Sequence, residues 1–106
     1  MNIQKLMKEA QRAQRKMAEA QERLAEMTVE GSAGAGMVTA VAKGDGTIAS
    51  IRIDKSVVDP EDVEMLEDLV TAAVSEAQRR AKELQEQELG SVMGGMGGMG
   101  GLGGLF

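Results

Sequence analysis

The 106-residue chain contains no histidine, cysteine, tryptophan or tyrosine, and its one aromatic residue, Phe106, is the last. The lack of histidine and cysteine excludes imidazole general bases, thiol nucleophiles, disulfides and the usual zinc ligands. The lack of aromatic side chains removes the stacking platforms on which single-strand nucleic-acid binders depend. We therefore expect a protein that is not an enzyme, with no catalytic residue, no cofactor, no bound metal and no small-molecule substrate.

Long apolar runs are missing as well. The first residues, MNIQKLMKEAQ, contain no apolar core of a signal peptide, and no stretch is long and apolar enough for a membrane span. The sequence thus predicts a soluble, cytoplasmic protein without a membrane partner. Residues 90–106 are a glycine and methionine repeat that buries too little surface to order itself, so we expect one domain over residues 1–89 and a disordered Gly/Met-rich tail over 90–106.

Charge is segregated along the chain, although the net charge of -5 taken alone argues against a nucleic-acid partner. Residues 1–24 hold six basic and three acidic side chains, a net charge of +3. Residues 54–68 hold seven acidic side chains and one lysine, a net charge of -6. The basic surface that would contact a nucleic-acid partner is therefore expected near the N-terminus and not in the middle of the chain.

The N-terminal segment has the pattern of one long helix. Apolar residues recur at alternating spacings of 3 and 4, and no glycine or proline interrupts them before Gly31. This heptad seam consists of Ile3, Leu6, Ala10, Ala13, Met17, Ala20, Leu24 and Met27. The narrow, alanine-rich seam favours packing against one other helix, and the segment would reach roughly 37 Å.

The middle of the chain has the period of β-strands. We expect strands over 28–32, 36–43 and 47–54, with Thr47, Ala49, Ile51 and Ile53 on one face of the third. Gly44-Asp45-Gly46 predicts a tight hairpin. The glycines from Gly31 to Gly36 join two strands and lack a following Lys-Ser or Lys-Thr, which favours a bulge or flexible connection over a phosphate-binding loop. A meander of three strands has two bare edges, which invite pairing with another copy.

A second helix is expected from the segment Asp59-Pro60-Glu61-Asp62, with Asp59 as the cap and Pro60 as the first helical residue. The acidic residues here favour helix capping over a calcium or magnesium site, because no EF-hand pattern is present. The pattern predicts that the helix ends at Gly90 and is exposed beyond about Gln78, where its apolar face thins.

Two groups of basic residues are candidates for DNA binding. Four of them recur at helical spacing on the face opposite the seam, and a fifth flanks them: Lys5, Lys8, Arg12, Arg15 and Lys16. Like charges at such spacing do not stabilise a helix, and a basic stripe on a projecting helix suits the phosphates of duplex DNA. The second group is Arg79, Arg80 and Lys82. Solvated helix faces remain the alternative for both groups, more so for the second, whose neighbours such as Glu76 offer i,i+4 pairs.

The order of these parts resembles the YbaB/EbfC family of nucleoid-associated proteins. The resemblance covers about residues 1–89 and is carried by the segments VEGSAGAGMVTAVAKGDGTIASIRID and VVDPEDVEMLEDLVTAAVSEAQRRA. It implies an α+β fold of order α-β-β-β-α in a homodimer whose long helices project like tweezers around double-stranded DNA. It further implies binding with low sequence specificity and a role in nucleoid organisation and gene regulation.

The leading hypothesis is therefore a homodimeric, nucleoid-associated protein that binds double-stranded DNA through its basic helix. The alternative is a protein-binding adaptor or a holdase-like dimer, which would use the heptad seams and the Met-rich tail to contact other proteins. The salt dependence of DNA binding separates the two hypotheses.

Overall fold

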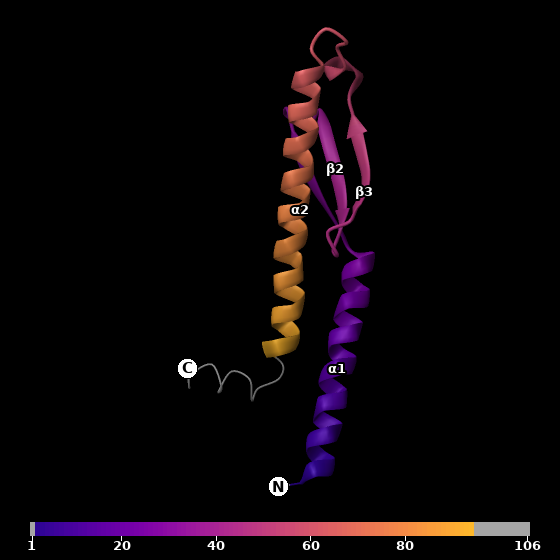
Figure 1. The fold of residues 1–106 in the computed structure, drawn as a ribbon, viewed down its shortest axis with the longest axis vertical. Helices are drawn as coiled ribbons and strands as arrows, with labels where there is room; N and C mark the ends of the chain where they lie inside the picture. Colours follow the sequence, from indigo (N-terminus) through magenta and orange to yellow (C-terminus); the bar gives the residue numbers. More distant parts are fainter. Residues whose placement is uncertain (1, 95–106) are drawn as a thin grey trace.

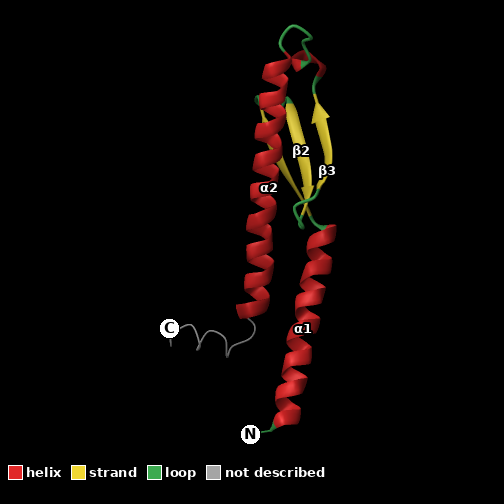
Figure 2. Cartoon of the chain, viewed as in Figure 1, coloured by secondary structure: helices red, strands yellow, loops and turns green. Residues whose placement is uncertain are grey.

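The computed structural model describes residues 2–94 and has one three-stranded antiparallel sheet and two long helices (Figures 1 and 2). The elements in chain order are α1 (Ile3–Glu26), β1 (Thr28–Ala33), β2 (Val38–Lys43), β3 (Ile48–Ile53), the short 3-10 helix η1 (Lys55–Val57) and α2 (Val63–Gly94). The strands are ordered β1-β2-β3. The predicted α+β fold of order α-β-β-β-α is confirmed.

Helix α2 packs along one face of the sheet, over β1 and β2, and the layers meet through small side chains (Figure 1). The core consists of Val38, Ala40 and Ala42 from β2 and Ala73, Ala77 and Ala81 from α2. Gly31 in β1 lies directly against the backbone of α2, where a Cβ atom would clash with the Ala73 carbonyl oxygen and the Ala77 nitrogen. Gly31 is thus required for close packing of a strand on a helix, and at this residue the structure has a regular strand in place of the predicted bulge or flexible connection.

The connection between β1 and β2 is a turn in which the backbone takes positive φ angles. Gly34, Ala35 and Gly36 have φ of 62°, 56° and 86°. The left-handed region costs glycine little, so the glycines here supply backbone freedom for a tight reversal of the chain.

A β-bulge in β3 corrects the predicted alternation of that strand. Val41 pairs with Ser50, but the next residue, Ala42, pairs with Ile48, so Ala49 is the extra residue of the bulge. The bulge places Ile48 on the α2 side of the sheet together with Ile51 and Ile53, in place of the predicted Thr47 and Ala49. A period of two carries no information about an inserted residue, and the prediction was wrong for this half of the strand.

The start of α2 also differs from the prediction. Asp59 accepts a hydrogen bond from the Glu61 N–H at 2.9 Å, and the Asp62 N–H donates to the Asp59 carbonyl oxygen at 2.9 Å. Asp62 is the residue that caps the helix, by accepting from the Met65 N–H at 3.3 Å. The same Asp-Pro-Glu-Asp sequence satisfies the rules for a β-turn with proline at its second position, and here the turn precedes the helix.

One face of the C-terminal half of α2 is covered, which corrects the prediction that this half is exposed beyond Gln78. Ala81 is buried, Leu84 and Leu89 are half-buried, and Val92 is only 8% exposed. The cover is α1, which lies alongside and antiparallel to this half of α2 (Figure 1). The helix passes through Gly90 and ends at Gly94, and the rest of the predicted disordered tail, residues 95–106, lies outside the described residues.

Candidate nucleic-acid interface

The N-terminal half of α1 projects as an arm from the body formed by the sheet and α2 (Figure 1). Asn2 caps the helix by accepting from the Lys5 N–H at 3.2 Å. Further along the helix, Ala20 and Leu24 are buried, whereas the large apolar side chains of the arm are exposed. The single ion pair that joins the two helices within residues 2–94 is Arg23 with Glu88, at 3.4 Å. The arm is therefore held at its base and is open to solvent at its tip.

The predicted basic stripe lies on the exposed surface of this arm. All five side chains are exposed, and none of them is in an ion pair within residues 2–94: Lys5, Lys8, Arg12, Arg15 and Lys16. Glu9 is the one acidic residue among the first 18. Lys5, Lys8, Arg12 and Arg15 recur at spacings of 3 and 4, so they lie on one face of α1. The structure brings these four together as one continuous cationic surface.

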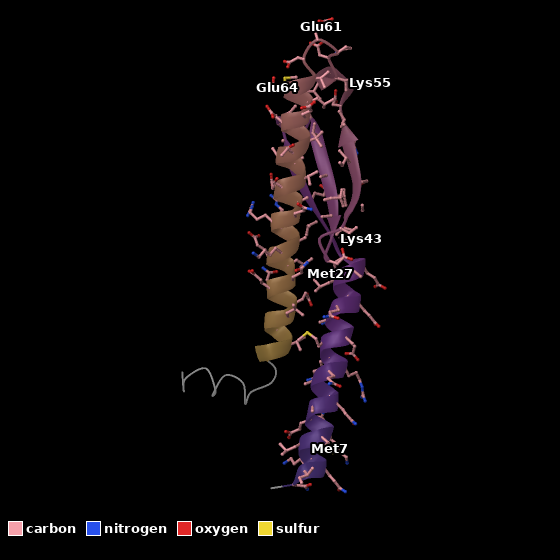
Figure 3. The ribbon with its side chains drawn as sticks, viewed as in Figure 1. Met7, Met27, Lys43, Lys55, Glu61 and Glu64 are labelled. Carbon is pink, nitrogen blue, oxygen red and sulfur yellow. The ribbon has the colours of Figure 1, made fainter. Side chains whose placement is uncertain are left out.

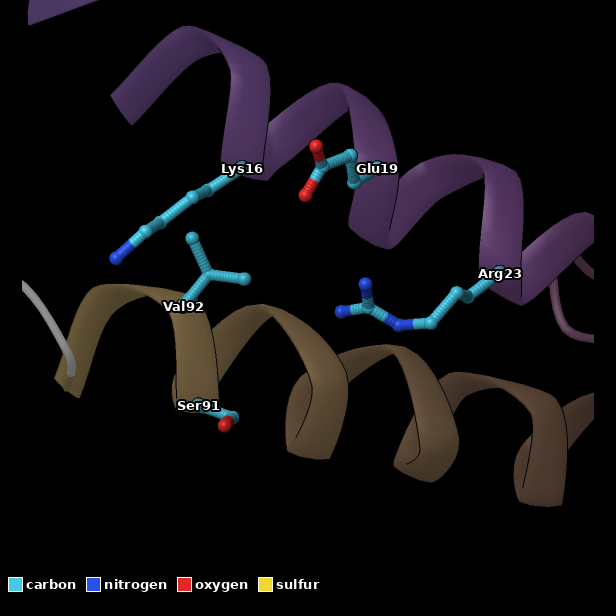
Figure 4. Close-up of a pocket in the computed structure, with 5 residues that line it drawn as sticks. All are labelled: Lys16, Glu19, Arg23, Ser91 and Val92. Carbon is cyan, nitrogen blue, oxygen red and sulfur yellow. The ribbon is translucent and has the colours of Figure 1, made fainter. Parts of the chain in front are cut away.

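Lys16 differs in position from the other four cations. Its side chain extends beside Val92 at the edge of a hollow of about 270 Å³ between the two helices, which Glu19, Arg23 and Ser91 also line (Figure 4). The hollow is shallow, and its rim carries both signs of charge. Lys16 flanks the stripe, as the sequence predicted, and the structure adds that it lies beside α2.

The sign of the charge changes along the same face of α1. The positions that follow Arg15 at helical spacing are acidic: Glu19, Glu22 and Glu26. All three are exposed. A polyanion would therefore be attracted to the tip of the arm and repelled from its base, which limits the contact to about the first four turns.

The charges also separate along the length of the molecule. Met7 marks the arm at one end, whereas Glu61 and Glu64 lie at the opposite end, beyond the sheet (Figure 3). The molecule extends 71 Å along this axis. Residues 54–68, with their net charge of -6, are thus far from the arm and would point away from a DNA molecule held there.

The second predicted group lies on α2 and is largely neutralised. Arg79 pairs with Glu83 at 2.7 Å, and Arg80 pairs with Glu76 at 2.9 Å. Lys82 is exposed and has no ion pair within residues 2–94. These residues are on a different element from the arm, and the structure does not merge the two groups into one surface.

Two further exposed cations were not among the predicted site residues. Lys43 and Arg52 are exposed on the face of the sheet that α2 leaves uncovered, as their strand positions alternate with those of Ala42 and Ile51. Alternation in β2 and β3 was the signal that could have found these two residues.

The acidic residues between the sheet and α2 have structural roles. Asp54 accepts from the Ser56 N–H at 2.8 Å, and hydrogen bonds from the backbone N–H and hydroxyl of Ser56 lower the pKa of Asp54. Within residues 2–94, no group of three or more acidic side chains is arranged to hold a metal ion. In the same part of the chain neither helix is long and apolar enough to cross a bilayer.

Comparison with known proteins agrees with this architecture. The YbaB/EbfC DNA-binding family matches residues 1–96. A protein of Acetivibrio thermocellus named nucleoid-associated protein is 54% identical over 94 residues, which are 89% of this chain and 83% of that protein. One of the same name from Saccharopolyspora erythraea is 51% identical over 93 residues, 88% of this chain and 80% of that protein.

A solved structure shares the fold at low sequence identity. The uncharacterized protein HP0035 from Helicobacter pylori superposes with a TM-score of 0.72 at 20% identity. The match covers 82% of this chain and 91% of that one. The likeness supports the arrangement of two long helices and a three-stranded sheet.

Proposed function

The chain belongs to the YbaB/EbfC DNA-binding family, and from that premise we propose that it binds double-stranded DNA as a homodimer through the arm of α1. It is a DNA-binding, nucleoid-associated protein. In the finer proposal it binds with low sequence specificity, alters the conformation of DNA, and thereby contributes to nucleoid organisation and gene regulation.

The observation that carries the proposal is the set of exposed, unneutralised cations on the arm. A protein that places lysine and arginine side chains against phosphates releases condensed counterions, and this release supplies most of the affinity of binding that does not depend on sequence. Cations that are already in ion pairs would gain less, because an acidic neighbour must be displaced first. Within residues 2–94, the cations from Lys5 to Arg15 have no acidic partner to displace, whereas Arg79 and Arg80 each have one.

Low sequence specificity follows from the kind of contact. Phosphate contacts position a protein on the duplex but carry no direct sequence information. The arm offers a row of cations along one helix face, and no aromatic side chain lies between them. We expect such a row to track the DNA backbone.

The homodimer is supported by the shape of the chain and by its small core. The radius of gyration is 20.0 Å, whereas a compact domain of this length would have about 13 Å. Val38 is the largest fully buried side chain among residues 2–94, and Ile51 and Ile53 on the edge strand β3 are 43% and 39% exposed. A second copy that covers this edge would bury apolar surface and also satisfy the unpaired edge of the sheet.

The experiment that tests the proposal is a series of gel shifts with duplex DNA at several salt concentrations. A dimer offers up to ten arm cations, and with about half of them engaged the plot of log K against log salt should have a slope of roughly -4 to -5. The variant with Lys8, Arg12 and Arg15 changed to glutamine keeps helix propensity and leaves the seam unchanged. It should bind all sequences more weakly, and its slope should be shallower by roughly 1 for each phosphate that the arm no longer touches.

Lys55→Gln is the matched control, because Lys55 is an exposed cation at the acidic end of the molecule. It should bind like the wild type. If the triple variant retains the wild-type affinity and salt slope, the arm is not the binding surface. The exposed apolar side chains of the arm would then favour the protein-binding adaptor or holdase-like dimer, for which binding of partners would depend weakly on salt.

A further inference from the structure

The apolar seam of α1 extends beyond the helix that covers it. Ala20 and Leu24 are buried, whereas Ile3, Leu6 and Met7 are 69%, 49% and 58% exposed. Single apolar side chains are ordinary on a protein surface, but these three are neighbours on one helix, and Ile3 and Leu6 belong to the seam that is buried further along. We call the exposed stretch, formed by Ile3, Leu6, Met7 and Ala10, the uncovered seam.

Helix α2 runs toward the end of α1 that carries this seam. Val92 lies next to Lys16 (Figure 4), and α2 is antiparallel to α1 (Figure 1), so the described part of α2 ends short of the N-terminal turns of α1. Twelve residues, 95–106, remain. Extended, they could span up to about 40 Å, while the stretch of α1 from Lys16 back to Ile3 is only about 20 Å long. The remaining chain is long enough to reach every residue of the uncovered seam.

The composition of residues 95–106 suits an apolar helix surface. The segment has no charged side chain, and pairs of glycine alternate with single apolar residues. Its large apolar residues are Met96, Met99, Leu102, Leu105 and Phe106. Methionine adapts its shape to irregular surfaces, and glycine allows the backbone to approach closely. The family match ends at residue 96, so most of this segment lies beyond it.

We propose that residues 95–106 bind along the uncovered seam of α1 in the same chain. The bound segment covers apolar surface that would otherwise associate with other molecules. It leaves the basic stripe exposed, because the stripe from Lys5 to Arg15 lies on the opposite face of the helix. The proposal does not depend on DNA binding and is tested without DNA.

The lack of cysteine allows a direct test on the full chain. Gly101→Cys introduces a single thiol for a nitroxide spin label without altering any apolar residue of the segment. In the 15N-labelled protein, we expect the label to broaden the amide signals of residues 3–13 and to leave those of residues 63–73, at the start of α2, unchanged. A label that broadens no amide of residues 3–13 overturns the proposal.

A test variant and a control variant show whether the segment binds the uncovered seam itself. Leu6→Gln, at an exposed position of the seam, should abolish most of the broadening, while Gln11→Ser, at an exposed position off the seam, should preserve it. Circular dichroism of both variants checks that α1 is still helical.

In a mixture of spin-labelled 14N chains with unlabelled 15N chains, the signals of residues 3–13 should stay sharp. If they broaden there, the segment binds a second copy, which contradicts binding within one chain.

Discussion

The Gly44 N–H donates to the carbonyl oxygen of Met27 at 2.8 Å, a hydrogen bond that joins the β2–β3 hairpin to the residue at which the arm leaves the sheet. Gly44 is buried against the last turn of α1, and a Cβ atom added to it would clash with the carbonyl oxygen of Leu24. Gln85 of α2 donates to the Gly44 carbonyl oxygen at 2.7 Å. One glycine therefore contacts both long helices and positions the arm relative to the body.

Gly44→Ala should destabilise the fold and loosen the base of the arm. The added methyl group has no space without a backbone shift, and overpacking of this kind costs about 1 to 3 kcal/mol. Urea denaturation measures the loss in the free energy of unfolding. Gly90→Ala is the control, because Gly90 is helical with open space around it, and it should raise stability by up to about 1 kcal/mol. Equal stability of Gly44→Ala and the wild type would contradict the close approach.

The hairpin aspartate should make stability depend on pH. Hydrogen bonds from the hydroxyl and the backbone N–H of Thr47 lower the pKa of Asp45, and the N–H lies 2.9 Å from its carboxylate oxygen. The pKa of Asp45 is therefore lower in the folded protein than its unfolded value of about 3.9. The ionised carboxylate stabilises the fold at pH values above about 3.9. This contribution is lost as the pH falls through the folded pKa.

Asp45→Asn keeps a hydrogen-bond acceptor but removes the charge. The variant should be less stable than the wild type at neutral pH, and the difference should shrink in acid. Urea denaturation at both pH values measures it. A loss of the same size at both values would mean that the ionised carboxylate has no special role.

The apolar edge of β3 should be required for the homodimer. Ile51 pairs with Ala40, and Ile53 pairs with Val38, so both face the α2 side of the sheet at its open edge. The wild type should have about twice the mass of 11.2 kDa in light scattering. Changing Ile51 and Ile53 together to lysine should give a monomer, while Ser50→Lys, on the opposite face of the same strand, should leave the dimer intact. A clean wild-type monomer at micromolar concentration would contradict the proposal.

Local patterns were sufficient to predict the order of elements, and long-range contacts account for most of the errors. The heptad spacing from Ile3 to Met27 predicted α1 because a helix repeats within its own sequence. The exposure of α2 beyond Gln78 was mispredicted because its cover comes from α1, which is distant in sequence. The bulge at Ala49 depends on the pairing partner of each residue, which one strand cannot specify alone.

The candidate site was predictable to the extent that it depends on helix periodicity. The spacing of Lys5, Lys8, Arg12 and Arg15 places them on one face of any helix, and the structure has that helix. Spacing alone does not determine that Glu83 neutralises Arg79, since an i,i+4 neighbour can pair or point into solvent. The separation of the arm from the acidic end required the three-dimensional path of the chain.

The difference between paired and unpaired cations gives the last prediction. Arg79 and Arg80 have acidic partners at 2.7 and 2.9 Å, whereas the arm cations have none within residues 2–94. Exposed pairs of this kind contribute only about 0.2 to 1 kcal/mol to stability, so changing Arg79, Arg80 and Lys82 together to glutamine should leave the fold and the dimer intact.

This α2 variant removes the same number of positive charges as the change of Lys8, Arg12 and Arg15 to glutamine, and its net charge is therefore the same. If the arm is the binding surface, the arm variant should lose much more affinity for duplex DNA at low salt and should show the shallower salt slope. The double change Glu19→Lys and Glu22→Lys should leave affinity unchanged or raise it, because the cationic face then continues toward the base of the arm. Equal losses for the two triple variants would show that total charge governs binding, and a larger loss for the α2 variant would move the binding surface to α2.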